Sequence, residues 1–251
     1  MAAPVTVPEP FTLIEYPVLG STNDEASRLA VAGAADGTVV RADRQSAGRG
    51  RRGRNWQSPA GNLYCSIVVR PAAPPAVAAQ LSFVTAVTLA ETLDAVLPTG
   101  RTVCQKWPND VLIDGAKVAG ILLESSGAGT DAVDWVVIGC GVNVVEAPQD
   151  TDYPATSLHA AGAAGLGAGT VLPVFLTALH GWRTRWETAG MAPVRDAWLN
   201  RAHGLGKEMT VRLPDREIRG LFGGMDQTGA LLLDLADGTR QTISAGDVYF
   251  G

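Results

Sequence analysis

From residue 204 onward, the chain consists of short strand-forming runs that turn signals separate at close intervals. The runs cover residues 209–213, 217–225, 230–235 and 240–244. Pro214-Asp215, the segment Asp226 to Gly229, and Asp237-Gly238 divide them. Short strands at this spacing predict a small barrel of the SH3-like kind. We therefore expect two domains, residues 1–203 and residues 204–251.

The first domain combines strand and helix patterns, which predicts an α+β fold. Apolar residues recur at three-to-four spacing after the prolines at 71–75 and again over residues 172–186, and both stretches predict helices with one buried face. Further helices are expected at 193–201 and from Thr22, where Glu25 would complete a capping box. An ordered loop with a short helix is expected over residues 153–169. Strands are expected at residues 11–16, 38–42, 63–70, 102–107, 111–113, 117–124 and 135–142. Asp114-Gly115 is a two-residue hairpin signal.

Composition limits the functional classes. The chain has 251 residues, is 46% hydrophobic and carries a net charge of -5, so a general nucleic-acid-coating role is disfavoured. Its three cysteines form no CxxC pair, which favours reduced thiols in a cytoplasmic protein. We find no signal-peptide pattern and no apolar run long enough to span a bilayer, and therefore expect no membrane partner.

The segment Ser46 to Asn62 concentrates arginines among glycines, as GRGRRGR, between two expected strands. Glycine lets a backbone approach a ligand closely, and arginine offers forked donors for phosphate and carboxylate. Three readings stay open from these residues alone: a solvated basic loop, a nucleic-acid contact, or a loop that closes over a small anion. The chain has no Walker A motif.

Lysine is rare in this chain, which has seventeen arginines and three lysines. Lys106 opens KWPND, and Lys117 lies in AKVAGILLE. A lysine is a compact charge that can neutralise a carboxylate and a phosphate as they join, but each could also be a strand-end surface residue. The polar residues of STN at 21–23, of KWPND and of GCGVN at 139–143 are equally compatible with caps and turns or with a ligand site.

Taken in order, five motifs resemble the biotin–protein ligase family. They are STN, Q-x-x-GRGRRGR-x-W, KWPND, K-x-x-GIL-x-E and G-x-G-x-N. The resemblance runs from about Tyr16 to the C-terminus and implies a mixed β-sheet flanked by helices, as in class II synthetase catalytic domains, followed by the SH3-like barrel. It also implies two steps: ATP activates biotin as biotinyl-5′-AMP, and a carrier lysine then takes the biotin.

The resemblance assigns roles to matching positions, with Lys117 and Arg51 as catalytic candidates. The implied biotin-binding residues are Ser21, Thr22, Asn23, Gln45, Gly48, Arg49, Gly50, Arg51, Lys117 and Gly120. The implied nucleotide-binding residues are Arg51, Arg54, Trp56, Asn109, Asp110, Lys117 and Asn143. Asp110 is the candidate ligand of Mg²⁺, whereas Lys106 stays open between a site role and a structural role.

The resemblance also predicts substrates and partners. ATP with Mg²⁺ and biotin would be used without a bound prosthetic group, and the acceptor would be a biotin carboxyl carrier protein or carrier domain. Because STN begins at residue 21, we expect no DNA operator binding; a homodimer is compatible with the sequence. The alternatives are a lipoate or octanoate ligase of the same superfamily and a nucleic-acid-binding module. We further expect the Arg49–Arg54 loop to be mobile until ligand binds.

Overall fold

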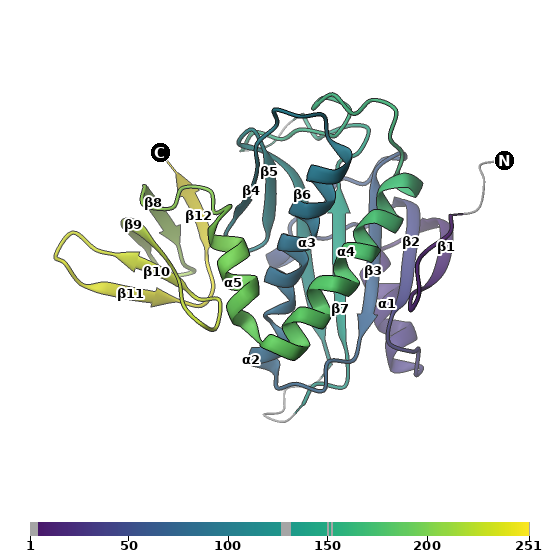
Figure 1. Ribbon diagram of the computed structural model, residues 1–251, viewed down its shortest axis with the longest axis horizontal. Coiled ribbons are helices and arrows are strands. Elements are labelled where there is room, and N and C mark those ends of the chain that lie inside the picture. Colours follow the sequence, from purple (N-terminus) through teal and green to yellow (C-terminus); the bar gives the residue numbers. More distant parts are fainter. Residues whose placement is uncertain (1–4, 127–131, 150, 152, 251) are drawn as a thin grey trace.

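A seven-stranded mixed sheet forms the larger part of the molecule in the computed structural model, which describes residues 5–126, 132–149, 151 and 153–250. The strand order is β1-β2-β3-β7-β6-β5-β4, and only β1 and β2 are parallel neighbours. Figure 1 shows this sheet behind the central helices. Its strands are β1 (Thr12–Leu19), β2 (Thr38–Gln45), β3 (Leu63–Val69), β4 (Val103–Lys106), β5 (Asp110–Ile113), β6 (Ala116–Ser125) and β7 (Val136–Val142).

Helices cover both faces of this sheet, which explains why β3 is buried along its whole length. One face packs against α1 (Thr22–Val31) through a small cluster that includes Ala26 and Val68. The other packs against α3 (Leu81–Val96), with α4 (Ala168–Ala189) and α5 (Met191–Leu199) alongside it, and a single turn, α2 (Pro75–Ala78), precedes α3. The predicted α+β class with a mixed, helix-flanked sheet is confirmed.

A second sheet of five antiparallel strands lies beside α5 and β4, at the left of Figure 1. Its order is β11-β10-β9-β8-β12. Four of its strands match the predicted runs, but the sequence reading missed the fifth, which follows a short turn. The strands are β8 (Glu208–Arg212), β9 (Glu217–Met225), β10 (Leu231–Asp234), β11 (Arg240–Ile243) and β12 (Asp247–Phe250).

Aromatic side chains join the two sheets. The Trp198 ring meets Phe83 on one side and Phe222 on the other, both edge to face, at centroid distances of 6.0 and 6.3 Å. The Trp107 indole N–H donates to the Gly229 carbonyl at 3.0 Å. One apolar cluster therefore crosses residue 204, and the division into domains 1–203 and 204–251 stays a prediction.

Two local predictions are wrong. The segment 153–169 is a loop, as expected, but the short helix predicted within it does not form before α4 begins at Ala168, because glycines and Pro154 interrupt any helical run. The capping box at α1 does not form: Glu25 instead accepts hydrogen bonds from Tyr16 and Arg28, and these contacts lower the Glu25 pKa to about 2.

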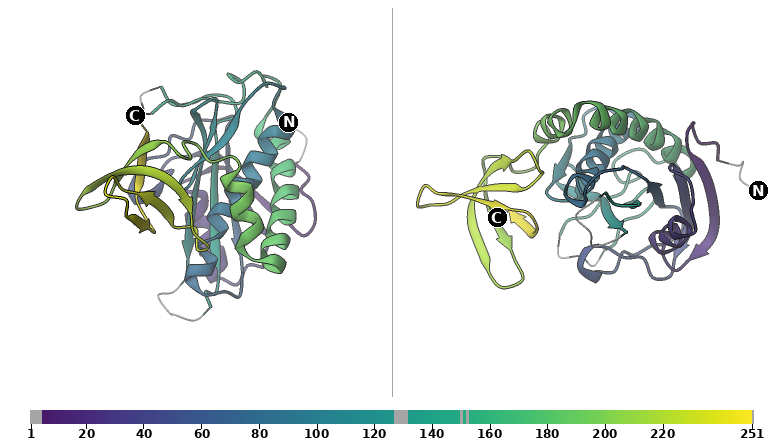
Figure 2. Two further views of the ribbon diagram at one scale, coloured as in Figure 1. Left: turned by 60° about the vertical axis from the view of Figure 1, so that its left-hand side comes forward. Right: turned by 90° about the horizontal axis from the view of Figure 1, so that it is seen from below.

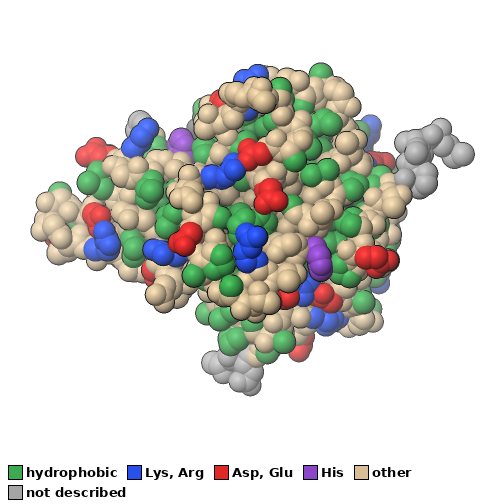
Figure 3. All heavy atoms as spheres, viewed as in Figure 1, with side chains coloured by type: hydrophobic (Ala, Val, Ile, Leu, Met, Phe, Trp, Pro, Cys, Tyr) green, Lys and Arg blue, Asp and Glu red, His purple; other side chains and the backbone are tan. Residues whose placement is uncertain are grey.

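The face of the molecule seen in Figure 3 carries no concentration of positive charge comparable to that of the arginine loop. There, acidic and basic side chains are interspersed among apolar ones. Residues 75–96 would be long and apolar enough to cross a membrane by length and composition, but 72% of their most apolar window is buried inside the fold. That burial is typical of a core helix.

Candidate active site

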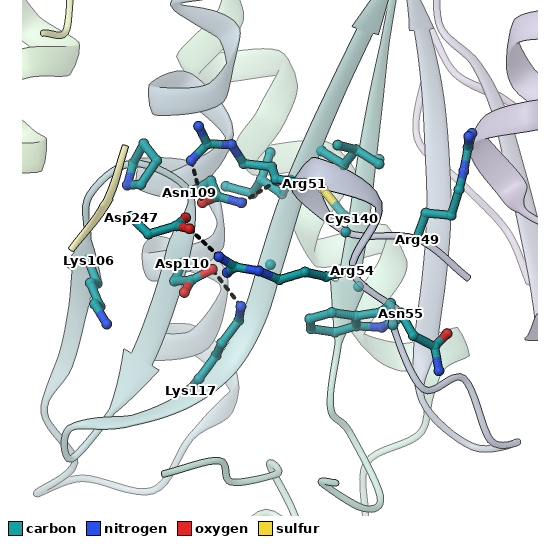
Figure 4. Close-up of a pocket in the computed structure, with 18 of the residues that line it drawn as sticks. Arg49, Arg51, Arg54, Asn55, Lys106, Asn109, Asp110, Lys117, Cys140 and Asp247 are labelled. Carbon is teal, nitrogen blue, oxygen red and sulfur yellow. Dashed lines mark hydrogen bonds and ion pairs between the residues drawn. The ribbon is translucent and has the colours of Figure 1, made fainter. Parts of the chain in front are cut away.

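A hollow of about 1070 Å³, including its open mouth, lies on the α1 side of the seven-stranded sheet, under the arginine loop and the edge of the small sheet. Figure 4 shows side chains from both ends of the chain meeting there. Five cationic side chains line it against two carboxylates, so the hollow is locally positive in a chain of net charge -5. The charged lining residues are Arg49, Arg51, Arg54, Lys106, Lys117, Asp110 and Asp247.

One end of the hollow is a network of polar groups at the start of α1, in which neutral side chains meet the Glu124 carboxylate. The Thr22 backbone N–H donates to Gln45 Oε1 at 2.8 Å, and the two side-chain oxygens lie 3.1 Å apart. Ser66, fully buried on β3, contacts Thr22 Oγ1 at 2.8 Å and Asn23 Oδ1 at 2.6 Å. Asn23 Nδ2 donates to Glu124 at 2.8 Å. These bonds fix the positions of Thr22, Asn23 and Gln45 together.

Ser21 is the N-cap residue of α1 by position, but its side chain makes no capping hydrogen bond. The side chain is 4% exposed and lines the hollow. A helix cap was one of the two readings open for this serine, and the geometry leaves its hydroxyl available to a ligand instead.

The floor of the hollow is made of glycines on two adjacent strands. A Cβ at Gly139 would overlap the Asn23 amide, and one at Gly141 would lie 2.5 Å from the Trp56 ring. A Cβ at Gly120 would lie 3.0 Å from the same ring. Glycine is therefore needed here so that Asn23 and Trp56 can approach the floor closely.

Lys117 lies at the centre of the hollow. Its Nζ is 2.7 Å from Asp110 Oδ1 and faces the rings of Trp56 and Tyr153 at 5.4 and 5.0 Å. The register of β5 against β6 shifts beside it, so that Leu112 pairs with Lys117 while the next pair is Val111 with Ala119. Such an irregularity re-aims a strand side chain, which accounts for Lys117 pointing into the hollow.

Asn143 does not line the hollow. It is 3% exposed, and its Nδ2 donates to the Thr156 carbonyl at 3.1 Å. The Thr156 N–H in turn donates to the Lys117 carbonyl at 2.9 Å, and Lys117 N–H donates to Pro154. Asn143 therefore supports the segment that pairs with the Lys117 backbone. Gly48 also stays outside the lining, at a tight turn where a Cβ would lie 2.5 Å from the Trp56 carbonyl.

The arginines of the loop have partners in the protein. Arg49 contacts Asp24 and Glu124. Arg51 Nη1 lies 3.3 Å from Asn109 Oδ1, while the Asn109 amide donates to β6 at 2.8 Å. These partners offset the repulsion between like charges that motivated the expected mobility. That mobility stays a prediction.

Arg52 and Arg54 both reach Asp247, the first residue of β12. Asp247 is the main site residue that the sequence reading missed, because it follows an ordinary Gly246 turn and precedes a strand of only four residues. Nearby, Lys106 Nζ faces the Tyr249 ring at 5.7 Å. Lys106 therefore lines the hollow and is not only a structural residue of β4. Burial lowers the pKa of Lys106 and the pKa of Arg51.

Within the described residues, no group of three or more His, Cys, Asp or Glu side chains could hold a metal ion. Asp110 faces the hollow but is paired with Lys117. A single carboxylate suits a Mg²⁺ ion that is held mostly by water and substrate phosphates.

Comparison with known proteins places this geometry in context. A model described as the biotin/lipoate A/B protein ligase family matches residues 16–143, and the biotin protein ligase C-terminal domain matches residues 204–251. The biotin–[acetyl-CoA-carboxylase] ligase of Paracoccus denitrificans is 42% identical over 92% of this chain and 97% of its own length. The bifunctional ligase/repressor of Escherichia coli is 34% identical over 92% of this chain and 72% of its own.

A solved structure agrees. The biotin protein ligase of Aquifex aeolicus in complex with biotin and ATP has a TM-score of 0.81 and 28% identity, covering 95% of this chain and 99% of that one.

Proposed function

Because this chain belongs to the biotin/lipoate A/B protein ligase family, we propose that it is an ATP-dependent biotin–protein ligase. It adenylates biotin and transfers it to a lysine of a carrier protein. One observation carries the proposal: a single hollow brings Lys117 together with a hydrogen-bonding network at the start of α1 and with the arginines of the loop. This combination suits a ligand with a polar neutral head and a carboxylate that must meet a phosphate.

The polar network suits the ureido head of biotin. Ser21, Thr22, Asn23 and Gln45 offer hydroxyl and amide groups at the closed end of the hollow. The glycine floor lets the Asn23 amide and the Trp56 ring lie close against the sheet, where they would border the fused rings and chain. Gly50 and Arg49 would close over the ligand from the loop side.

In the first step, a biotin carboxylate oxygen attacks the α-phosphorus of ATP, and the bond to pyrophosphate breaks. Lys117 would neutralise both the carboxylate and the α-phosphate, and its contacts with Asp110 and two aromatic rings support this role by holding its amine in the hollow. Arg51 and Arg54 would hold phosphate oxygens. Because charge builds around one phosphorus, such fixed cations stabilise the transition state.

In the second step, the amine of a carrier lysine attacks the carbonyl carbon of the mixed anhydride, and AMP leaves. The arginine loop must exclude water while the anhydride waits and must admit the carrier lysine. Its contacts with Asp247 and Glu124 are ion pairs of exposed arginines, and Arg51 adds a partly buried hydrogen bond to Asn109. Such contacts can exchange for ligand contacts.

Mg²⁺ would neutralise the polyphosphate of ATP when bound, and Asp110 is the residue offered to it. We assign the acceptor to a biotin carboxyl carrier protein or carrier domain, because the Paracoccus relative is named for acetyl-CoA carboxylase. A cytoplasmic location, the lack of a membrane partner and a homodimer remain parts of this proposal.

ATP–pyrophosphate exchange tests the function. The purified protein is supplied with biotin, lipoate, octanoate or no acid, and exchange that requires biotin is expected. Exchange with lipoate or octanoate instead would assign the chain to the other branch of its family. Absence of exchange, together with salt-sensitive binding of DNA or RNA, would favour the nucleic-acid module.

A further inference from the structure

Asn62 ends the segment Ser46 to Asn62 that carries the arginine loop, although it belongs to none of the five motifs. It is 2% exposed. Its Oδ1 accepts the backbone N–H groups of Val144, Val145 and Glu146 at 2.9, 2.8 and 3.2 Å, and its Nδ2 donates to the Glu146 carbonyl at 2.8 Å. Backbone N–H groups only donate, so they fix which end of the amide is the oxygen. One side chain therefore holds the segment that follows β7.

The residues that Asn62 holds support a second segment of the chain. The Val144 carbonyl accepts the His159 N–H at 3.0 Å. The Val145 carbonyl accepts the Ser157 hydroxyl, also at 3.0 Å. Residues 157–159 therefore rest on the residues whose N–H groups Asn62 binds.

The second segment leads directly to Lys117. The ladder between β6 and β7 begins at Ala119, so it does not reach the Lys117 backbone. Residues 154–156 take that place: the Lys117 N–H donates to the Pro154 carbonyl at 2.8 Å, and the Lys117 carbonyl accepts the Thr156 N–H at 2.9 Å. The Lys117 backbone is therefore held on this side of β6 by a strip that continues into residues 157–159.

We propose that Asn62 is a positioning residue that keeps Lys117 in place through residues 144–146 and 154–159. The inference rests on the proposed function, in which Lys117 is the cation between carboxylate and phosphate. Without the Asn62 amide, three N–H groups lose their acceptor, and the segment rearranges because a buried donor without a partner is costly. The strip beside Lys117 then loosens, and the lysine amine no longer keeps one position.

A double-mutant cycle in pyrophosphate exchange tests whether Asn62 acts through Lys117. Asn62→Ala should lower kcat about tenfold in the otherwise wild-type protein, since a small displacement of a reacting group is costly. In the Lys117→Ala background, the same change should lower kcat less than about twofold, because no amine is left to misplace. A residue with a purely structural role would lower kcat by the same factor in both backgrounds.

Hydrogen–deuterium exchange gives a second readout that does not depend on activity. In Asn62→Ala, the backbone amides of Lys117 and Thr156 should exchange about tenfold faster or more, although neither bonds to Asn62. Asn62→Asp keeps an oxygen that accepts the three N–H groups, and it should restore slow deuterium exchange and a kcat within about threefold of wild type.

Gln80→Ala is the matched control, because Gln80 is a buried amide on the face of the sheet away from the hollow. Its Oε1 accepts the Trp186 indole N–H at 2.8 Å. Its loss should leave kcat and the deuterium exchange of Lys117 unchanged. If Asn62→Ala does not fold, Ser157→Ala breaks the next link of the same path and should show the same dependence on Lys117.

The outcomes separate the two proposals. Equal losses of kcat in both backgrounds, or unchanged deuterium exchange at Lys117 in the folded variant, would overturn the role of Asn62 alone. Lack of biotin-dependent pyrophosphate exchange by the wild-type protein would overturn the proposed function and, with it, the part of Asn62 in that reaction.

Discussion

At the scale of single residues, Lys117 is the group on which the proposed chemistry depends most. Lys117→Ala removes the cation between carboxylate and α-phosphate, and we expect kcat of pyrophosphate exchange to fall by about 100-fold or more with the fold intact. Lys207→Ala is the control, because Lys207 is exposed and lies outside the hollow. A rate for Lys117→Ala within a few-fold of wild type would remove Lys117 from the mechanism.

A second prediction for a single residue concerns the pH dependence of ATP binding through Lys106. Burial lowers its pKa below the ordinary value of 10.5, so it loses its charge at a lower pH than an exposed lysine does. If Lys106 holds an ATP phosphate, the KM for ATP should increase as the pH is raised toward the lowered pKa of Lys106, because the amine then loses its positive charge. Lys106→Arg keeps its charge throughout and should flatten the rise; an identical profile in both proteins would contradict an ATP contact.

Sequence patterns identified the residues that carry unusual chemistry but not those that support them. Lys117, Arg51 and Gln45 stood out through rarity or motif, and they do meet in one hollow. Ser66 and Asp247 did not stand out, because a serine within a strand and an aspartate after a turn are ordinary. Their significance comes only from the partners that the fold brings to them.

At the scale of elements, the arginine loop and β12 depend on each other. Asp247 pairs with Arg52 and Arg54 across the gap between the sheets. Asp247→Asn removes the negative charge, so we expect trypsin to cleave within residues 49–54 several-fold faster in the absence of ligand, with biotin and ATP restoring protection. Asp215→Asn, on an exposed turn of the small sheet, is the control. Equal cleavage of both variants and wild type would show that β12 does not hold the loop.

Strand positions could be predicted because each buried strand is a run of apolar residues between turn signals. β3 and β7 are such runs, and Asp114-Gly115 forms the predicted turn with both residues at positive φ. The register shift beside Lys117 could not be predicted, since it arises from pairing between β5 and β6 and leaves no local pattern. β12 was missed because four residues give too short an alternation to read.

At the scale of the whole molecule, the two sheets share one core around Trp198, which is 1% exposed. Trp198→Ala removes the ring that meets Phe83 and Phe222, and we expect the free energy of unfolding to fall by about 3–5 kcal/mol. Urea unfolding followed by both circular dichroism and tryptophan fluorescence should give one coincident transition for the wild-type protein. Two separated transitions would show that the sheets unfold independently. Trp135→Ala serves as the control for loss of a large ring, because Trp135 packs on the α1 side of the large sheet, away from the small sheet. It should leave the contact between the two sheets unchanged.

The glycine floor sets a limit for anyone who wishes to adapt this protein to bulkier labels. Gly120, Gly139 and Gly141 already carry the smallest possible side chain, so no substitution there can enlarge the space beneath the ligand. Any additional volume must come from the side chains that pack on these glycines, and Trp56 is the largest of them. Replacing Trp56 with a smaller residue is therefore the first change to make in a library intended to accept enlarged biotin analogues.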